Sequence, residues 1–584
     1  MGAPMTRTLP GRPGRRSTPC GPPGCPVTDP CRSRGERLVG ATTEVPMEVD
    51  DPTTALLDGA TELTLHDALA RAAARQPDAP ALLSDERQLT WAELDAEVNR
   101  VANLMRAVGF APGDVVGFMI NKRPEVVIGF LACCRMGAVF APVNYKLNLD
   151  RVRDQFQTAG IAGVFTEKAR DRLLEGLLPL LPNPRLIVYV DGPGRLGESH
   201  YGMADDQPST FDPGDFEATP DTICYLNYTS GSTGRPKGAQ TTHRNIQHNA
   251  VDTIAGLGFR ADDVFLGMFS VFAHPHELFH RSLLLGSPFV ILDSMNPRVI
   301  AEAVERFGVT WMMAVPSFYE MMLDWVRPRD GSGSQPGHLA DVSSLRILES
   351  GGAYVGAETL TRMEEAFGCT FLPVWGCTEA TGVGLANGPD PAARKLGATG
   401  RPIPGYEFRV VDDKGRDLPP GEVGELLMRG PAVTTRGYIN QPEETVAAFV
   451  DGWYHTQDLC TMDEDGFVRF VSRKSEMLKI GGIRVYPLEI EAVIKEHPDV
   501  VDVVVVRAEE RVRGEVARAI VSTVPGSGLT VRGLQSYCRG RLAVYKVPRI
   551  VEFWQEVPKL PNGKIDKQAV LRTPPDPTRD EREG

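Results

Sequence analysis

The segment 228–238 constrains this chain more than any other part of its sequence. It places serines, threonines and glycines directly before Arg235, Pro236 and Lys237. Small residues let backbone N–H groups approach a phosphate, hydroxyls add donors, and a lysine adds positive charge. A Walker A loop is excluded, because Pro236 stands where its second glycine is needed and Gly238 follows the lysine in place of Ser or Thr. The segment therefore predicts a phosphate-binding loop of another type rather than a Gly/Ser linker.

Length and charge narrow the class of protein further. A chain of 584 residues is too long for one simple domain and predicts two to four structural units. Its net charge of −13 argues against a nucleic acid partner. The longest apolar run, about nine residues at 126–134, is about half of what a bilayer span needs. Scattered cysteines are typical of reduced thiols, so we expect a cytoplasmic protein without a membrane span.

The first 46 residues differ from the rest of the chain. They hold seven arginines, no lysine, and many prolines and glycines. Such a segment cannot bury a core, and it lacks the apolar stretch of a secretory signal. We therefore expect 1–46 to be a disordered N-terminal extension, with Met47 as an alternative start of the chain.

The following region alternates between helix and strand patterns. Thr90 precedes an apolar period and predicts a helix start. A strand is predicted at 115–120, a helix at 124–136 and a strand at 138–142. This β-α-β alternation continues to about Phe371 and predicts parallel or mixed sheets with flanking helices.

Two further patterns follow. Strands at 408–412 and 424–429, separated by turns, predict a small antiparallel β-barrel or sheet. A compact α+β unit is expected after Ser472. Its predicted elements are a helix from Pro487, strands at 500–506 and 517–524, and a helix near 531–541. The predicted fold is therefore α/β, with a large N-terminal region of several subdomains and a small, mobile α+β C-terminal domain.

The segment 228–238 closely resembles the signature loop of the adenylate-forming (AMP-binding) superfamily. This superfamily includes acyl- and aryl-CoA synthetases, non-ribosomal adenylation domains and firefly luciferase. Seven more segments resemble its motifs, in the same order, within about residues 60–572. They are 351–353, 375–379, 400–405, 421–426, 456–459 and 472–476, followed by 561–565 as the segment of the catalytic lysine.

The resemblance implies a division of the chain. It places an AMP-binding adenylation domain at 55–471, a hinge at 472–476 and the C-terminal AMP-binding-enzyme domain at 477–572. We expect the tail 573–584 to be disordered.

The resemblance also implies ATP, Mg²⁺ and coenzyme A as reactants and cofactors. Thr378 would bind the α-phosphate, Glu379 would hold Mg²⁺, and Lys564 would bridge the acyl carboxylate and the α-phosphate. Asp458 would accept the ribose hydroxyls with support from Arg473. The β- and γ-phosphates would be bound by Thr229, Ser230, Gly231, Ser232, Thr233, Gly234 and Lys237. The adenine would be bound by Gly351, Gly352, Ala353, Trp375 and Gly376.

The C-terminal domain would serve the second half-reaction after rotation at the hinge. By resemblance, Lys479 and Arg484 face the adenylate in the thioester-forming state, and Gly481 and Gly482 admit the pantetheine arm. Two residues depart from the family pattern. Gln457 replaces the usual glycine before the ribose aspartate, and Ser475 replaces the usual hinge residue.

The acyl pocket is the least regular part of the resemblance. His274 and His276 are predicted to line it, and with His280 they form an HxHxxxH pattern that could also ligate a metal. No aspartate lies between Asp263 and Asp293, which disfavours an α-amino acid as the substrate.

The sequence thus predicts an AMP-forming acid–thiol ligase that acts on a fatty or aryl carboxylic acid and coenzyme A. One alternative acceptor is the pantetheine of a carrier protein, and another is a different nucleophile. The alternative from a different functional class is a catalytically silent nucleotide-binding or regulatory protein. A homodimer is a possible assembly.

Overall fold

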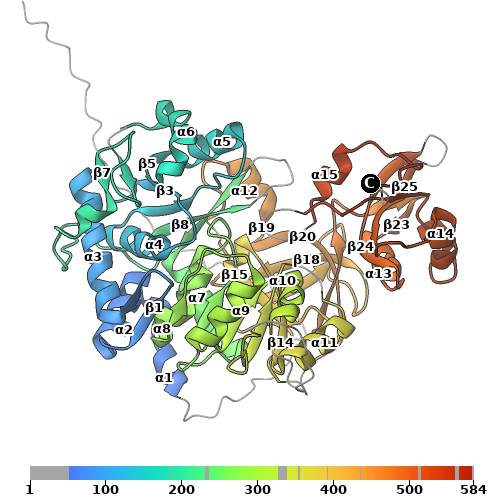
Figure 1. Ribbon diagram of the computed structural model, residues 1–584, viewed down its shortest axis with the longest axis horizontal. Coiled ribbons are helices and arrows are strands. Elements are labelled where there is room, and N and C mark those ends of the chain that lie inside the picture. The colour runs from blue at the N-terminus through green and yellow to red at the C-terminus, as the bar shows by residue number, and fades with distance from the viewer. Residues whose placement is uncertain are drawn as a thin grey trace, which may run out of the picture. The chain divides into compact units, whose positions relative to one another are not determined.

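The computed structural model describes residues 52–183, 186–229, 236–326, 339–352, 355–390, 392, 394–434, 436–510, 514–559 and 565–581. Within this part of the chain lie two large mixed sheets, a five-stranded antiparallel sheet and a small α+β unit (Figure 1). The predicted extension 1–46 lies outside the described residues, and so do the predicted site residues 230–234, Ala353 and Lys564.

The first large sheet has seven strands in the order β7-β6-β5-β3-β4-β8-β9. Every neighbouring pair is parallel except β8 and β9. The helices α4 and α5 supply crossovers that parallel neighbours need. The strands are β3 Val115–Met119, β4 Val139–Pro142, β5 Ile161–Thr166, β6 Ile187–Tyr189, β7 Ser199–His200, β8 Ile223–Thr229 and β9 Lys237–Thr242.

The second large sheet has nine strands in the order β16-β15-β14-β13-β12-β10-β11-β1-β2. Its middle, from β14 to β1, is parallel, and both ends are antiparallel. The strands are β1 Pro80–Leu83, β2 Gln88–Thr90, β10 Phe265–Gly267, β11 Phe289–Val290, β12 Trp311–Ala314, β13 Ile347–Ser350, β14 Thr370–Cys377, β15 Gly382–Ala386 and β16 Arg401–Pro402.

The predicted small barrel or sheet is a five-stranded antiparallel sheet, in which β20 pairs with β18, β19 and β21. Its strands are β17 Glu407–Val411, β18 Gly424–Arg429, β19 Phe449–Val450, β20 Trp453–Met462 and β21 Val468–Arg473. The expected turns are present, with Gly415 and Gly421 at positive φ.

The C-terminal unit confirms the α+β pattern. A hairpin of β22 and β23 precedes a sheet in which β25 lies between β24 and β26. The elements are β22 Leu478–Ile480, β23 Ile483–Val485, α13 Pro487–Lys495, β24 Val500–Glu510, β25 Gly514–Thr523, α14 Val531–Arg539, β26 Ile550–Phe553 and α15 Lys567–Arg572.

Local sequence signals set the helix ends. The Thr90 hydroxyl accepts from the Glu93 N–H, and the Glu93 carboxylate accepts from the Thr90 N–H, so a capping box begins α3. Pro124 begins α4, and Gly137 at φ 75° ends it, as predicted. The remaining helices of the large region are α1 Pro52–Leu57, α2 Leu65–Arg75, α3 Trp91–Val108, α5 Leu149–Ala159, α6 Asp171–Glu175, α7 His243–Leu257, α8 His280–Leu285, α9 Pro297–Phe307, α10 Pro316–Met322, α11 Ala357–Phe367 and α12 Pro442–Ala448; α4 spans Pro124–Met136.

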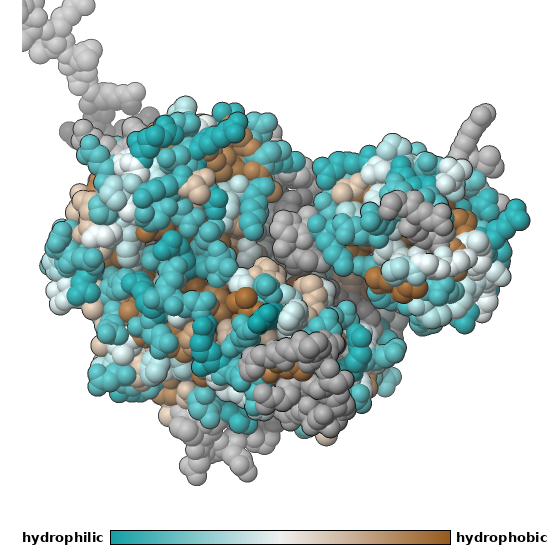
Figure 2. Space-filling model, in the orientation of Figure 1, coloured by the Kyte–Doolittle hydropathy of each residue, from teal (hydrophilic) through white to brown (hydrophobic). Residues whose placement is uncertain are grey.

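The helices cover the sheets with aromatic and aliphatic side chains. Phe118 of β3 and Phe140 of β4 lie 4.3 Å apart between ring centroids, and Phe130 of α4 packs on Phe140 at 4.6 Å. On the face of the molecule in Figure 2, hydrophobic residues form scattered areas among hydrophilic ones. Among the described residues, no helix combines the length and apolar character that a bilayer crossing requires.

Residues 573–581 of the predicted tail lie within the described part of the chain. Residues 576–581 run beside β26, where the Phe553 N–H donates to Arg579 O at 3.2 Å and the Glu581 N–H donates to Phe553 O at 2.8 Å. The Asp576 N–H also donates to the Glu552 carboxylate at 3.0 Å. Non-local hydrogen bonds order this segment, and its own sequence has no periodicity that would reveal them. The last three residues lie outside the described part.

A buried ion pair in the C-terminal unit yields a stability prediction. Arg518 and Glu552 are 2% and 0% exposed and form two hydrogen bonds of 2.7 and 3.0 Å. Because Arg518→Met leaves a buried carboxylate without its main cation, we expect a loss of about 3–5 kcal/mol in the stability of this unit. Hydrogen exchange of the β25 amides measures this loss. The half-exposed Arg507, which pairs with Glu515 at 3.5 Å, provides the control. Arg507→Met should change stability by less than about 1 kcal/mol, and equal effects would contradict the argument.

Candidate active site

The predicted phosphate loop connects two antiparallel strands of the seven-stranded sheet. β8 ends at Thr229, β9 begins at Lys237, and these two residues are partners in the strand register. The intervening residues 230–235 lie outside the described part of the chain. The hairpin therefore holds the two described ends of the loop side by side, while the phosphate contacts of 230–234 stay predictions.

Tyr438 lies between two of the predicted site residues. The Lys237 ammonium lies 5.2 Å from the Tyr438 ring centroid, within cation–π range. The Tyr438 hydroxyl donates a hydrogen bond to Oε1 of Glu379. Burial, and then the charge of Glu379, raises the pKa of Tyr438, so the hydroxyl remains a donor at neutral pH. One aromatic side chain thus contacts both the predicted triphosphate lysine and the predicted magnesium ligand.

No sequence pattern marks Tyr438 as a site residue. It follows Gly437 in the loop between β18 and α12, and no spacing to another catalytic residue type marks it. The signal is non-local: Tyr438 forms a bridge with Ala239 of β9, and the Ile439 N–H donates to Gly238 O at 2.9 Å. This pairing brings Tyr438 beside Lys237.

Thr378 and Glu379 begin a short 3₁₀ turn, Thr378–Ala380, directly after β14. Both residues are buried. The Thr434 N–H donates to the backbone oxygen of Glu379 at 2.9 Å, so the turn is fixed from the loop after β18. A carboxylate that is oriented by Tyr438 is a hard oxygen ligand, and its chemistry fits Mg²⁺.

The Asp458 carboxylate joins the residues predicted to bind the nucleoside. The Trp375 indole N–H donates to Oδ2 at 2.9 Å, and Nε of Arg473 lies 2.7 Å from Oδ1. Asp458 and Arg473 are cross-strand partners on β20 and β21, so the strand register itself creates the ion pair. Asp458 is 1% exposed, whereas the Arg473 side chain is about half exposed. One hydrogen bond and one ion pair therefore join the three residues around the buried Asp458 carboxylate.

The predicted glycines near this group occupy positions with little room. A Cβ at Gly376 would lie 2.1 Å from the backbone oxygen of Gly382. A Cβ at Gly351 would lie 3.3 Å from Cγ2 of Val374. Side chains at these positions would disturb β14 and the segment after β13.

Two of the three pocket histidines are deeply buried. Nε2 of His276 lies 2.9 Å from Thr381 O, and because a carbonyl oxygen only accepts, this nitrogen carries the proton. Burial lowers the pKa of His276 to about 4, so the ring is neutral. Nε2 of His280 lies 3.2 Å from Oδ1 of Asn249. Both rings are therefore part of the packed interior.

His274 has a different environment. It is partly exposed, adopts a left-handed φ of 53°, and its Nδ1 lies 3.4 Å from Nδ2 of Asn227. Asn227 stands two residues before Thr229, so of the two predicted pocket histidines His274 is the one beside the phosphate loop. Oε2 of Glu277 lies 3.8 Å from Nδ1 of His274. Burial raises the pKa of Glu277 to about 8, which keeps this carboxyl protonated at neutral pH.

A separate group of ligand-type side chains lies at Cys134, Cys224 and His243. Their donor atoms all lie within 4.8 Å of one another, and all three residues are buried. The Leu65 N–H donates to Nδ1 of His243 at 3.2 Å. A neutral imidazole has one nitrogen lone pair, and this hydrogen bond uses it. The group therefore fits hydrogen bonding among thiols and an imidazole better than metal ligation.

The C-terminal site predictions fall on the β22–β23 hairpin. Lys479 and Arg484 are cross-strand partners, and Gly481 and Gly482 form the turn between them. Both glycines have positive φ, 58° and 83°, as a type I′ turn requires. The turn thus explains the glycine pair by itself. Arg484 forms an ion pair of 2.6 Å with Asp413.

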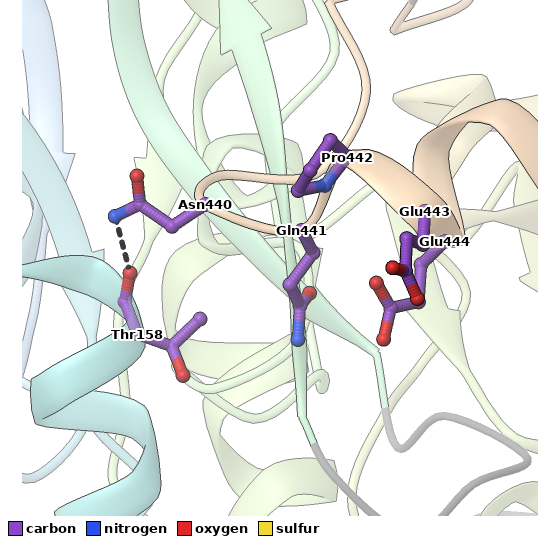
Figure 3. Close-up of a pocket in the computed structure, with 6 residues that line it drawn as sticks. All are labelled: Thr158, Asn440, Gln441, Pro442, Glu443 and Glu444. Carbon is purple, nitrogen blue, oxygen red and sulfur yellow. Dashed lines mark hydrogen bonds between the residues drawn. The ribbon is translucent and has the colours of Figure 1, made fainter.

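A small polar cavity lies near the loop. Figure 3 shows it between Thr158 of α5 and the residues from Asn440 to Glu444, with a volume of about 320 Å³. Asn440 donates to Thr158 O at 2.9 Å, and Gln441 donates to Pro236 O at 3.4 Å. The cavity therefore adjoins the end of the predicted phosphate loop, but it contains none of the predicted nucleotide residues.

Comparison with known families identifies two matches. Residues 69–439 match the family described as AMP-binding enzyme, and residues 489–564 match the AMP-binding enzyme C-terminal domain.

Individual proteins and structures agree with this result. Feruloyl-CoA synthase from Amycolatopsis sp is 34% identical over 514 residues, which cover 86% of this chain and 97% of that protein. The fatty acid–[acyl-carrier-protein] ligase ScoC from Streptomyces coeruleorubidus is 32% identical, over 84% of this chain and 93% of that protein. Among solved structures, the anthranilate CoA ligase AuaEII in complex with anthranoyl-AMP has a TM-score of 0.79 and 26% identity. The match covers 88% of this chain and 97% of that one.

The buried carboxyl of Glu277 predicts a pH effect. Its folded pKa of about 8 lies above the unfolded value of 4.5, so between these pH values the native state binds more protons. The free energy of unfolding therefore falls as the pH rises from about 4.5 to about 8. Because Glu277→Gln removes this titration, we expect the variant to gain Tm relative to wild type between pH 5 and pH 8. Thermal unfolding at four pH values measures the difference. The exposed Glu422→Gln should show no such trend, and a constant difference for Glu277→Gln would refute the neutral carboxyl.

Proposed function

The chain belongs to the AMP-binding enzyme family, and on this premise we propose that it is an AMP-forming acid–thiol ligase. It activates a carboxylic acid with ATP, releases pyrophosphate, and transfers the acyl group to coenzyme A with release of AMP. The observation that carries the proposal is the group formed by Trp375, Asp458 and Arg473. A buried carboxylate fixed between an indole and a guanidinium presents oxygen acceptors to a ribose beside an aromatic ring.

The first half-reaction joins two anions. The acid's carboxylate oxygen attacks the α-phosphorus of ATP, and the bond to the pyrophosphate oxygen breaks. Fixed positive charge and oriented donors lower the barrier where negative charge develops. Lys237 on the triphosphate side, and Lys564 at the reacting centre, supply this charge in the proposal. Thr378 donates to the α-phosphate.

The magnesium ion is part of the proposal. Glu379 would hold it, with Tyr438 orienting the carboxylate. When bound, the ion would neutralise charge on the phosphate oxygens. A homodimer and a cytoplasmic location stay predictions.

The second half-reaction forms the thioester. The coenzyme A sulfur attacks the acyl carbonyl carbon, and AMP leaves with the oxygen of the mixed anhydride. Lys479 and Arg484 at the base of the hairpin, and Gly481 and Gly482 at its turn, are the residues we assign to this state. The boundaries 55–471, 472–476 and 477–572 complete the proposal as adenylation domain, hinge and mobile domain.

We propose an aromatic acid as the substrate in preference to a fatty acid. Phe269 and Phe272 precede His274 and are partly exposed beside the site. The Phe269 ring reaches within 4.0 Å of a Cβ position on Gly351, and Phe272 meets Tyr145 edge-on at 4.9 Å. Aromatic walls favour a flat aryl group. The names of the relatives, feruloyl-CoA synthase and anthranilate CoA ligase, support the same class.

The acceptor has one alternative with a specific basis. The relative ScoC is named as a ligase for an acyl-carrier protein. A carrier-protein pantetheine presents the same thiol on the same arm as coenzyme A, so the residues near the thiol do not separate the two acceptors.

A substrate screen tests the assignment directly. We expect acid-dependent pyrophosphate release to be strongest with aryl acids among aryl, fatty, dicarboxylic and amino acids. With free coenzyme A, AMP and an acyl-CoA thioester should form in equal amounts. Pyrophosphate release without a thioester would instead indicate a carrier protein or another nucleophile.

The catalytic lysine separates the two half-reactions. Because Lys564 is assigned to the adenylation transition state alone, Lys564→Ala should lower acid-dependent ATP–pyrophosphate exchange by about 100-fold or more. Thioester formation from a synthetic acyl-adenylate should stay within about threefold of wild type. Unchanged exchange would show that the assigned mechanism is wrong.

The hairpin turn tests the thioester site. Gly482→Asn adds a side chain that tolerates a left-handed φ, so the turn persists while the space for a pantetheine arm is reduced. We expect pyrophosphate exchange to be retained and thioester formation to fall by about tenfold or more. Gly526→Asn, at φ 76° in another open turn, is the matched control. Equal loss of both half-reactions in Gly482→Asn would exclude the assigned role.

A further inference from the structure

A bulge in β20 lies directly before the ribose aspartate. Between two register pairs, Glu425–Leu459 and Leu427–His455, the chain advances two residues on β18 and four on β20. Gln457 lies in this bulge with φ 61°, a conformation that costs free energy for any residue with a Cβ. Bulges re-aim side chains, and the residue that follows is Asp458.

The Gln457 side chain is bonded to Glu425. Its amide Nε2 donates to Oε1 of Glu425 at 2.9 Å. Glu425 is 6% exposed, and Nδ1 of His455 also lies 3.4 Å from the same oxygen. A residue in an unfavourable backbone conformation is thus held by a hydrogen bond to a buried carboxylate.

The same carboxylate reaches the hinge segment. Lys474 Nζ lies 2.8 Å from Oε2 of Glu425, and the Lys474 N–H donates to Gln457 O at 2.8 Å. Gln457 and Lys474 are therefore connected twice, once through the backbone and once through Glu425. Each is the chain neighbour of one member of the Asp458–Arg473 ion pair.

We propose that Glu425 is a positioning residue for nucleotide binding. It holds Gln457 on one side and Lys474 on the other, and so fixes the orientation of Asp458 and Arg473 between them. The inference rests on the proposed function for the identity of the nucleotide. It also gives the Gln457 departure a physical role: the side-chain amide compensates for the conformation that glycine would adopt without cost.

The arrangement also bears on the predicted hinge, 472–476. Lys474 is tied to Glu425, whereas Glu476, two residues later, forms an ion pair of 2.6 Å with Lys567 of α15. Ser475 lies between these two tethers. Glu425 therefore keeps Lys474 with the five-stranded sheet.

Direct nucleotide binding tests the proposal without an acid or coenzyme A. We expect Glu425→Gln to raise the Kd for ATP, measured by isothermal titration calorimetry, by about tenfold, the effect of one lost charged hydrogen bond. Gln457→Ala keeps a Cβ at the positive φ but lacks the amide, and should raise Kd by about three- to tenfold. Lys474→Met should raise the Kd for ATP by about the same factor as Glu425→Gln. Lys474→Arg keeps the cation and should leave this Kd near the wild-type value. The exposed Glu422→Gln is the matched control.

Trypsin gives a second readout. Cleavage after Lys474 requires its side chain to leave Glu425, so we expect cleavage there to accelerate by about tenfold in Glu425→Gln and not in Glu422→Gln. If Glu425→Gln lowers Tm while the Kd for ATP stays unchanged, Glu425 has a merely structural role and the proposal is wrong. If wild type binds ATP but activates no acid, the proposed function fails while this inference stands.

Discussion

The candidate site depends on the interactions of one buried group, the carboxylate of Asp458. An ionised carboxylate removed from water is costly unless strong donors surround it. Here one donor, Trp375, comes from the nine-stranded sheet, and the other, Arg473, comes from the neighbouring strand of the five-stranded sheet. The two contacts of the Asp458 carboxylate thus join the two sheets at the point where the nucleoside is proposed to bind.

On the proposed triphosphate side, Tyr438 is the residue that joins separate parts of the fold. The segment 437–439 runs antiparallel to β9, where the Gln240 N–H donates to Gly437 O at 2.9 Å. This pairing places Tyr438 between Lys237 and Glu379. The connection after β18 therefore brings Tyr438 to the proposed phosphate end of the site, and β20 and β21 bring Asp458 and Arg473 to its proposed ribose end.

The sequence predicted what local chemistry determines. Helix α4 was expected at its observed bounds because Pro124 and Gly137 mark its two ends, and β18 because turns flank it. The fold class and the family follow from motifs in the correct order. Tyr438, the bulge at Gln457 and the ordered tail were not predicted, because each depends on a partner far away in the chain. A glutamine at φ 61° has no sequence signature when glycine is the expected residue.

A net charge of −13 repels ATP and a carboxylate, the two anionic substrates of the proposal. Binding them therefore requires little negative charge near the site itself. Two buried groups contribute to this. Burial keeps Glu277 protonated and His276 uncharged at neutral pH, so neither adds charge beside the phosphate loop. Arg473 forms an ion pair with Asp458, and Tyr438 contacts both Lys237 and Glu379. Under the proposed function, the remaining attraction for ATP would come from the loop 228–238 and from a bound magnesium ion. The proposed function thus gives a physical reason for the hydroxyl-bearing residues concentrated in the segment 228–238.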